Sequence, residues 1–391
     1  MQAHENPLQD CPRKSERQHR LGTALEYAAF ILGVLAFVLS AVYTRGFLDH
    51  FNIDWALAAS LVIGIGLVFK RHRNIAAAAA ICVSVNVFEL SYHLFITPEF
   101  GASTRAVIAV SLMQTLSVVL LLFLEARSGD SRQPARPPSP VSGSGTEQTL
   151  QYAVLIFGVL TFAVLVIASS NGEPYVDIVP DWFDGQITAA AAAALGLWRF
   201  GFKNYRLIFA FCAGDVLTDL WWLSIWDKTS PEWLIATLFA LVQLVAATAL
   251  LHFQHVPVEQ RQKTGPPSTV ALQYTALVLA VVGFTGAILM MSPPPGWPSL
   301  LNGDTGLIAS FAPDTGLIAS FAIGLSPAYK QLRTYTPASA LAGSALMYNV
   351  VFGPHHWLAY LFDIASLALV MVVVSLQMRA SRDPFHAEPA S

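Results

Sequence analysis

Long apolar runs recur along the whole chain and restrict its fold more than any other feature. Twelve runs occupy roughly 21–43, 54–69, 75–95, 105–124, 150–169, 185–201, 206–226, 232–252, 271–291, 305–326, 338–353 and 357–378. Several are short for a hydrocarbon core of about 30 Å. We interpret them as helices, because within such a core a helix satisfies its own backbone hydrogen bonds. They are continuously apolar rather than alternating, which argues against a closed β-barrel. The sequence therefore predicts an all-α integral membrane protein with about twelve transmembrane helices.

Composition supports a lipid environment. Hydrophobic residues make up 54% of the chain and charged residues only 12%, against about 25% charged residues in a soluble domain. The formal net charge of −3 provides no basic field for nucleic acid. Three cysteines are too few for a disulfide framework, and no zinc or haem-attachment spacing occurs. We therefore expect the lipid bilayer as a partner, no nucleic-acid partner and no cofactor or metal.

Basic residues sort to one side of the predicted spans. If the N-terminus lies inside and each run crosses once, the 22 Lys and Arg residues fall in inner segments except Arg45, Arg105 and Lys228. An excess of Lys and Arg in cytoplasmic loops is the usual topological bias. The sequence predicts an even number of spans and cytoplasmic N- and C-termini, with the cell (inner) membrane as the location.

The chain contains three related segments. Each opens with a similar phrase, at 24–27, 149–152 and 271–274. Further along, similar residues recur at a constant offset, which we call the repeat interval. Three sets of residues show it: Asp54, Asp184 and Asp314; Arg73, Lys203 and Arg333; and Glu89, Asp219 and Asn349. Matching residue types at one offset indicate tandem repeats. We predict three four-helix units, which are parallel because each has an even number of spans, and this excludes an inverted-repeat transporter.

The repeats divide the chain into seven parts. An N-terminal tail (1–20) and a C-terminal tail (380–391) flank units at 21–127, 149–255 and 271–379, which are joined by linkers at 128–148 and 256–270. The linkers are of low complexity and are predicted to be disordered and cytoplasmic. A pseudo-threefold arrangement of the units and a loose row of bundles are both consistent with the sequence.

A short duplication interrupts the third unit. The sequence DTGLIASFA occurs at 304–312 and again at 314–322. Since the second copy keeps the repeat interval, we interpret the first as an insertion at the outer end of the span. Whether 304–313 extends the helix or enlarges the outer loop stays open.

Polar residues inside the apolar runs are the candidate intramembrane polar site. In the third run of the first unit, spacings of four and three residues place Cys82, Asn86, Glu89 and His93 on one helix face. Asp215, Asp219 and Asn349 come from the third runs of the other units, and the fourth runs add the remainder. The whole candidate set is Glu89, Asp215, Asp219, Asn349, Asp363, Asn86, His93, Gln114 and Gln243.

These residues allow two interpretations. Ionisable groups within a membrane are costly and are functional candidates, here for binding a proton, a cation or a small solute. Alternatively, they are neutral, hydrogen-bonded groups that tie helices together, which is the less demanding interpretation.

Three functional hypotheses follow from the sequence. The function we lean towards is a permease-like role for a small solute or ion. The alternative is a non-catalytic membrane scaffold or assembly protein with unidentified protein partners. An intramembrane enzyme is the lesser alternative, because GxSxG, HExxH and P-loop signatures are absent and no catalytic residue is predicted.

Overall fold

The computed structural model describes most of the first two thirds of the chain and short pieces of the last third. The described residues are 11–43, 53–68, 74–95, 102–130, 145–170, 184–197, 204–225, 231–252, 271–272, 275, 278–279, 318–319, 337–344, 365, 368–373 and 375–376. Within these ranges every residue is helical except Asn74 and Asn204. The all-helical prediction is therefore confirmed for the part of the chain that is described.

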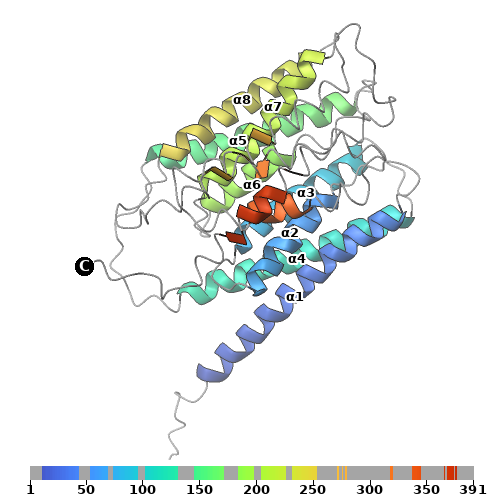
Figure 1. Ribbon diagram of the computed structural model, residues 1–391, viewed down its shortest axis with the longest axis vertical. Coiled ribbons are helices and arrows are strands. Elements are labelled where there is room, and N and C mark those ends of the chain that lie inside the picture. The colour runs from blue at the N-terminus through green and yellow to red at the C-terminus, as the bar shows by residue number, and fades with distance from the viewer. Residues whose placement is uncertain are drawn as a thin grey trace, which may run out of the picture.

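The first two thirds of the described chain contain eight helices, which are labelled in Figure 1, and each overlaps one predicted run. They are α1 (Cys11–Tyr43), α2 (Ile53–Val68), α3 (Ile75–Phe95), α4 (Ala102–Asp130), α5 (Gly145–Ser170), α6 (Asp184–Leu197), α7 (Tyr205–Ile225) and α8 (Pro231–His252).

The helices extend furthest beyond the apolar runs at three places. α1 begins within the predicted N-terminal tail, and α4 and α5 both extend into the predicted first linker. The added segment of α1 is rich in Arg, Lys, Glu and Gln, which are good helix formers, so the helix continues beyond its apolar part. The middle of the linker, 131–144, lies outside the described residues, as does the linker at 256–270.

Asparagine side chains cap two of the helices. The backbone N–H of Ala77 donates to Asn74 Oδ1 at 3.2 Å at the start of α3. The N–H of Leu207 donates to Asn204 Oδ1 at 3.3 Å at the start of α7. A side-chain oxygen at this position satisfies one of the free N–H groups of the first turn. The two caps are separated by the repeat interval and fix equivalent helix starts.

The helices form two groups with the same packing pattern. α1 packs against α2 and α4, and α3 packs against the same two helices. α5 packs against α6 and α8, and α7 packs against the same two. The two groups meet mainly through α3 and α6. Figure 1 accordingly has α1 with α4 on one side, α5 with α8 on the other, and the short pieces of the last third between them.

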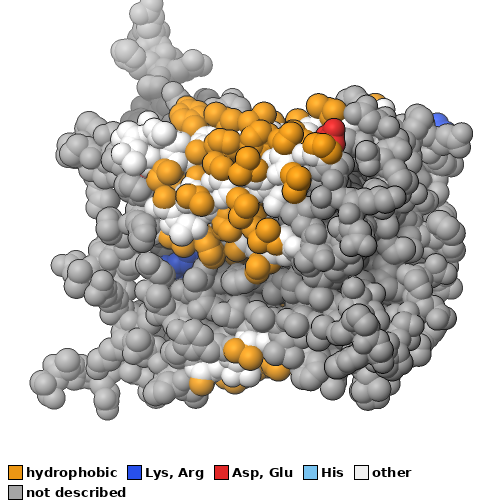
Figure 2. Space-filling view, turned by 90° about the horizontal axis from the view of Figure 1, so that it is seen from above, with side chains coloured by type: hydrophobic (Ala, Val, Ile, Leu, Met, Phe, Trp, Pro, Cys, Tyr) orange, Lys and Arg blue, Asp and Glu red, His pale blue; other side chains and the backbone are white. Residues whose placement is uncertain are grey.

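The outer helices have the properties of membrane spans. Four segments are long and apolar enough to cross a bilayer: Arg20–Leu39 in α1, Arg105–Glu125 in α4, Gly145–Ile167 in α5 and Leu234–Leu251 in α8. Their exposed side chains include Ile31, Leu116 and Val245. Figure 2 shows that the described part of one face is mostly hydrophobic. An apolar surface of this kind is unfavourable in water and suits contact with lipid.

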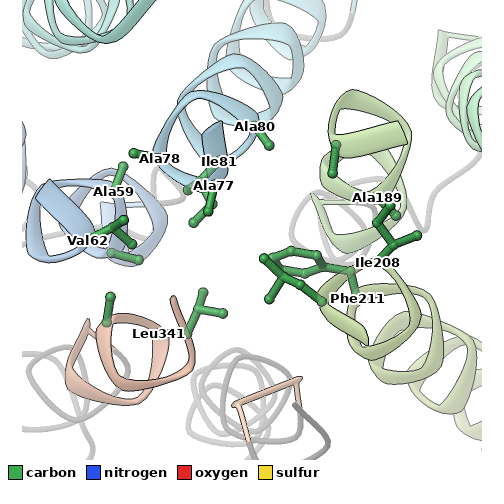
Figure 3. Packing of buried hydrophobic residues seen from close by; sticks show 14 of the residues in the cluster. Ala59, Val62, Ala77, Ala78, Ala80, Ile81, Ala189, Ile208, Phe211 and Leu341 are labelled. Atoms are coloured by element: carbon green, nitrogen blue, oxygen red, sulfur yellow. The ribbon is translucent and has the colours of Figure 1, made fainter. Parts of the chain in front are cut away.

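The inner helices pack through small residues. Ala77 to Ala80 of α3 and Ala189, Ala190, Ala192 and Ala193 of α6 are all buried. Small side chains allow helix backbones to approach closely, which stabilises helix pairs within a membrane. The resulting cluster also contains larger side chains from α7 and from the last third, including Phe211 and Leu341 (Figure 3). The core therefore joins segments that are far apart in the sequence.

Candidate functional site

Four of the nine candidate polar residues have described side chains. They are Asn86, Gln114, Asp215 and Gln243, and all four are buried. Glu89 and His93 lie on α3 and Asp219 lies on α7, but their side chains are outside the described set. Asn349 and Asp363 lie outside the described residues altogether.

Asn86 joins α3 to α4. Its Nδ2 donates to Thr115 Oγ1 at 2.6 Å, to Ser111 Oγ at 3.1 Å and to Cys82 O at 2.9 Å. Thr115 in turn donates to Cys82 O at 3.2 Å. Asn86 on the predicted polar face of α3 therefore meets polar residues of the fourth run. The contacts are helix-to-helix hydrogen bonds, which favours the structural interpretation for this residue.

Gln114 joins α4 to α2 next to a glycine of α1. Its Nε2 donates to Ala56 O at 3.1 Å and to Ser60 Oγ at 2.9 Å. A Cβ atom added to Gly33 would lie 2.8 Å from Ala56 O and would overlap the Gln114 amide and the Ser60 hydroxyl. The absence of a side chain at Gly33 thus creates the space in which the three helices meet.

The second group repeats this arrangement. Gln243 Nε2 donates to Gln186 O at 3.0 Å and to Val154 O at 3.1 Å. A Cβ atom on Gly158 would lie 2.9 Å from Gln186 O and would overlap the Gln243 amide. We call this set a glutamine clasp: a glycine of the first helix, a carbonyl of the second and a glutamine of the fourth. The two carbonyls occupy equivalent positions, because Ala56 and Gln186 are separated by the repeat interval.

The glycines of the clasp were missed by sequence reasoning, although a signal was present. Each glycine follows the tyrosine of the repeated opening phrase by the same interval, Tyr27 to Gly33 and Tyr152 to Gly158. A glycine that recurs at one repeat position inside a helix costs stability unless packing requires it. That recurrence was the available signal for a close approach.

Asp215 of α7 lies against the first turn of α6. Its Oδ2 accepts a hydrogen bond from the backbone N–H of Gln186 at 2.6 Å, and a Cβ atom on Gly185 would lie 2.6 Å from its Cγ. The first N–H groups of a helix have no partner within the helix and carry a partial positive charge, so a carboxylate is stabilised there. The buried carboxylate therefore fixes α7 against the first turn of α6.

A further polar cluster joins α5 to α7. Gln151 Nε2 donates to the Tyr205 hydroxyl at 2.8 Å, and that hydroxyl donates to Glu147 Oε1. All three side chains are buried. This cluster was also missed, because Glu147 fell within the predicted linker, although Gln151 belongs to the repeated opening phrase at 149–152.

The described polar groups make hydrogen bonds between neighbouring helices. Their partners are mostly backbone carbonyls, a backbone N–H and hydroxyls of neighbouring helices. No group of three or more His, Cys, Asp or Glu side chains suited to a metal ion occurs in the described ranges. Cys82 and Cys212 are buried free thiols in the core cluster.

The comparisons with known proteins add no family to this picture. No protein-family model matches the chain, and no curated protein or solved structure matches it either.

Proposed function

We propose that the chain is a membrane scaffold of three parallel four-helix units, twelve spans in all, closed around a shared core. In this arrangement the second and third spans of each unit form the interior, and the first and fourth spans face lipid. Both termini are on the cytoplasmic side of the cell membrane. The observation that carries the proposal is a set of contacts between helices from different units, two of which occur at equivalent repeat positions.

The first contact joins units one and two. Thr188 Oγ1 of α6 lies 2.6 Å from Ser84 Oγ of α3. Ser84 also donates to Ile81 O at 2.8 Å, so Thr188 donates to Ser84. This bond crosses directly between the two groups at the α3–α6 contact.

The other two contacts involve the last third of the chain. Gly214 and Ile318 follow Ser84 and Thr188 by the repeat interval, and a Cβ atom on Gly214 would lie 2.5 Å from Ile318 Cγ1. A Cβ atom on Gly343 would lie 3.2 Å from Leu61 Cδ1 of α2. Unit one therefore touches unit two, unit two touches the last third, and the last third returns to unit one. This order supports a closed ring over a loose row.

Apolar side chains at the centre favour a scaffold over an axial pore. Ile81, Phe211 and Leu341 are spaced by the repeat interval, are fully buried and belong to one cluster (Figure 3). A conducting path at this level would need polar groups or water against these side chains. The described polar residues instead bond helices to one another, which is what a rigid scaffold requires.

A permease-like role is the second candidate, with a proton, a cation or a small solute as substrate. It is favoured by the buried carboxylate of Asp215, because ionisable groups inside a membrane often mark ion pathways. Asp219 follows one turn later on α7, and Glu89 lies on the equivalent part of α3.

Two measurements on the full-length protein separate the candidates. In proteoliposomes, the scaffold predicts proton and cation fluxes equal to those of protein-free liposomes. Flux above that level, lost on combining Glu89→Gln with Asp219→Asn, would support the permease instead. After mild extraction and cross-linking, the scaffold should migrate with partner proteins in a defined complex. Migration of the chain alone would contradict a scaffold role.

A further inference from the structure

Each glutamine clasp leaves one buried oxygen without a hydrogen bond. Oε1 of Gln114 and Oε1 of Gln243 are both buried and have no partner among the residues that the structure describes. The orientation of each amide is settled, because its nitrogen lies against carbonyl oxygens, which accept but never donate. Exchanging the nitrogen and the oxygen would place acceptor against acceptor.

The unpartnered oxygen occurs in both clasps, which argues against an accident of packing. The neighbour of the first clasp is Ser60, whereas the equivalent position in the second is Ala190. The same atom is unpartnered in both despite this difference. A buried acceptor without a donor costs free energy, and such atoms in native proteins normally have a protein or water partner. Two equivalent clasps with the same unpartnered acceptor therefore indicate a ligand of the same kind in each.

The chemistry of the acceptor restricts the ligand to a small hydrogen-bond donor. The amide oxygen is neutral, and the clasp lies within a largely apolar core. A neutral O–H donor can enter without the desolvation cost that an ammonium ion carries. Each helix group also holds a second buried oxygen without a partner among the described residues, Asn86 Oδ1 between α3 and α4 and Thr237 Oγ1 on α8.

We propose that Oε1 of Gln114 and Oε1 of Gln243 each bind one small hydrogen-bond donor, and that water occupies both sites. A bound water satisfies the orphaned oxygen and can bridge it to other polar groups, as buried waters in proteins do. The two sites are equivalent in the repeat, so both should bind the same donor. The inference concerns binding and does not depend on whether the protein is a scaffold or a permease.

Isotope-edited infrared spectroscopy tests this in the full-length protein in lipid nanodiscs. Glutamine labelled with ¹³C at the side-chain carbonyl gives a stretching band whose frequency falls when the oxygen accepts a hydrogen bond. The bands of Gln114 and Gln243 are assigned by difference against Gln114→Met and Gln243→Met. Gln148, which is exposed, supplies the water-bonded reference through Gln148→Met. If Gln114→Met does not fold, Ser60→Ala shifts the Gln114 band and assigns it while Ala56 O remains in place.

The expected result is a hydrogen-bonded frequency for both clasp bands in hydrated samples, with a shift to higher frequency on drying. A shift to the bonded frequency only when ammonium chloride is added would support donor binding but identify ammonium as the donor. Bands at the unbonded frequency in hydrated samples, with and without ammonium, would overturn the proposal.

Discussion

At the residue scale, the interior is organised by pairs in which a glycine leaves room for a polar side chain of another helix. Gly33 accommodates the Gln114 amide, Gly158 accommodates that of Gln243, and Gly185 lies against the Asp215 carboxyl group. Each polar group reaches a backbone atom of a neighbouring helix. A hydrogen bond of this kind within a membrane contributes about 0.6 kcal/mol on average. The close approach matters as much as the bond, because it also brings the helices into contact.

Substituting alanine for Gly33 should destabilise the protein. The new Cβ would lie 2.8 Å from Ala56 O and would displace the Gln114 amide, and overpacking of this type costs about 1–3 kcal/mol. The shift is measured as the free energy of unfolding in lipid micelles by titration with a denaturing detergent.

Gly22→Ala on the same helix is the matched control. The nearest atom to its Cβ would be Leu121 Cδ1 at 3.9 Å, which is ordinary contact. Since alanine is the better helix former by about 1 kcal/mol, this variant should be as stable as the wild type or more stable. An equal loss of stability in both variants would show that replacing a glycine of α1 by alanine is harmful in general, so the clasp would not be the reason.

The sequence was sufficient to select the polar residues but not their partners. Asn86, Gln114, Asp215 and Gln243 stand out because a polar residue within an apolar run is rare and costly. Their partners are mainly backbone groups such as Ala56 O and Gln186 N–H, and backbone groups are identical in every residue. Only the packing of the helices decides which carbonyl or amide a side chain reaches.

At the element scale, the apolar runs predicted the helices well because a span must be both apolar and long enough. The starts of α3 and α7 agree with the runs within a residue, and an asparagine cap fixes where each of these two helices begins. The start of α1 was predicted too late, because the polar residues before Leu21 are good helix formers and the apolar criterion ignores them. Helix propensity thus places the start of α1 before Leu21, whereas hydropathy places it at Leu21.

Replacing the caps should loosen the first turns of two helices. Asn74→Ala and Asn204→Ala each remove a side-chain acceptor from a helix N-terminus, which costs about 1 kcal/mol. Hydrogen exchange, read by mass spectrometry, should become faster in the first turn of α3 for Asn74→Ala and in that of α7 for Asn204→Ala.

Serine at the same positions provides the comparison, because its hydroxyl also caps helices. Asn74→Ser and Asn204→Ser should retain near-native exchange. Fast exchange in the serine variants as well would mean that the asparagines act through contacts other than the cap.

At the scale of the whole molecule, the order of contacts around the core predicts which distant residues are neighbours. Ser84 should be next to Thr188, and Leu61 next to Gly343. In a protein with Cys11, Cys82 and Cys212 replaced by alanine, the pairs Ser84→Cys with Thr188→Cys and Leu61→Cys with Gly343→Cys should form intramolecular cross-links. The assay is a mobility shift of the full chain after mild oxidation or a short bismaleimide.

A pair that shares one of these positions is the negative control. Val245 of α8 is exposed, so Leu61→Cys with Val245→Cys should not cross-link within one chain. A cross-link between Ser84 and Thr188 without one between Leu61 and Gly343 would favour the open row of bundles.

The topology makes a separate prediction about the two sides of the membrane. Reporter domains inserted after Lys70 and after Glu173 should lie on opposite sides, the first in the cytoplasm and the second outside, because an odd number of predicted spans separates them. Protease or thiol-reagent accessibility in intact cells reads the side of each insertion. Finding both on one side would require an even number of spans between the two insertion points.

The contact between Leu61 and Gly343 also bears on how the protein is made. Leu61 is synthesised well before its neighbour Gly343, because the whole second predicted unit lies between them in the chain. Until then, the surface of α2 that will be covered must be shielded by lipid or by an insertion factor. A truncated product would keep this surface uncovered, which gives membrane quality control a feature by which to recognise unfinished chains.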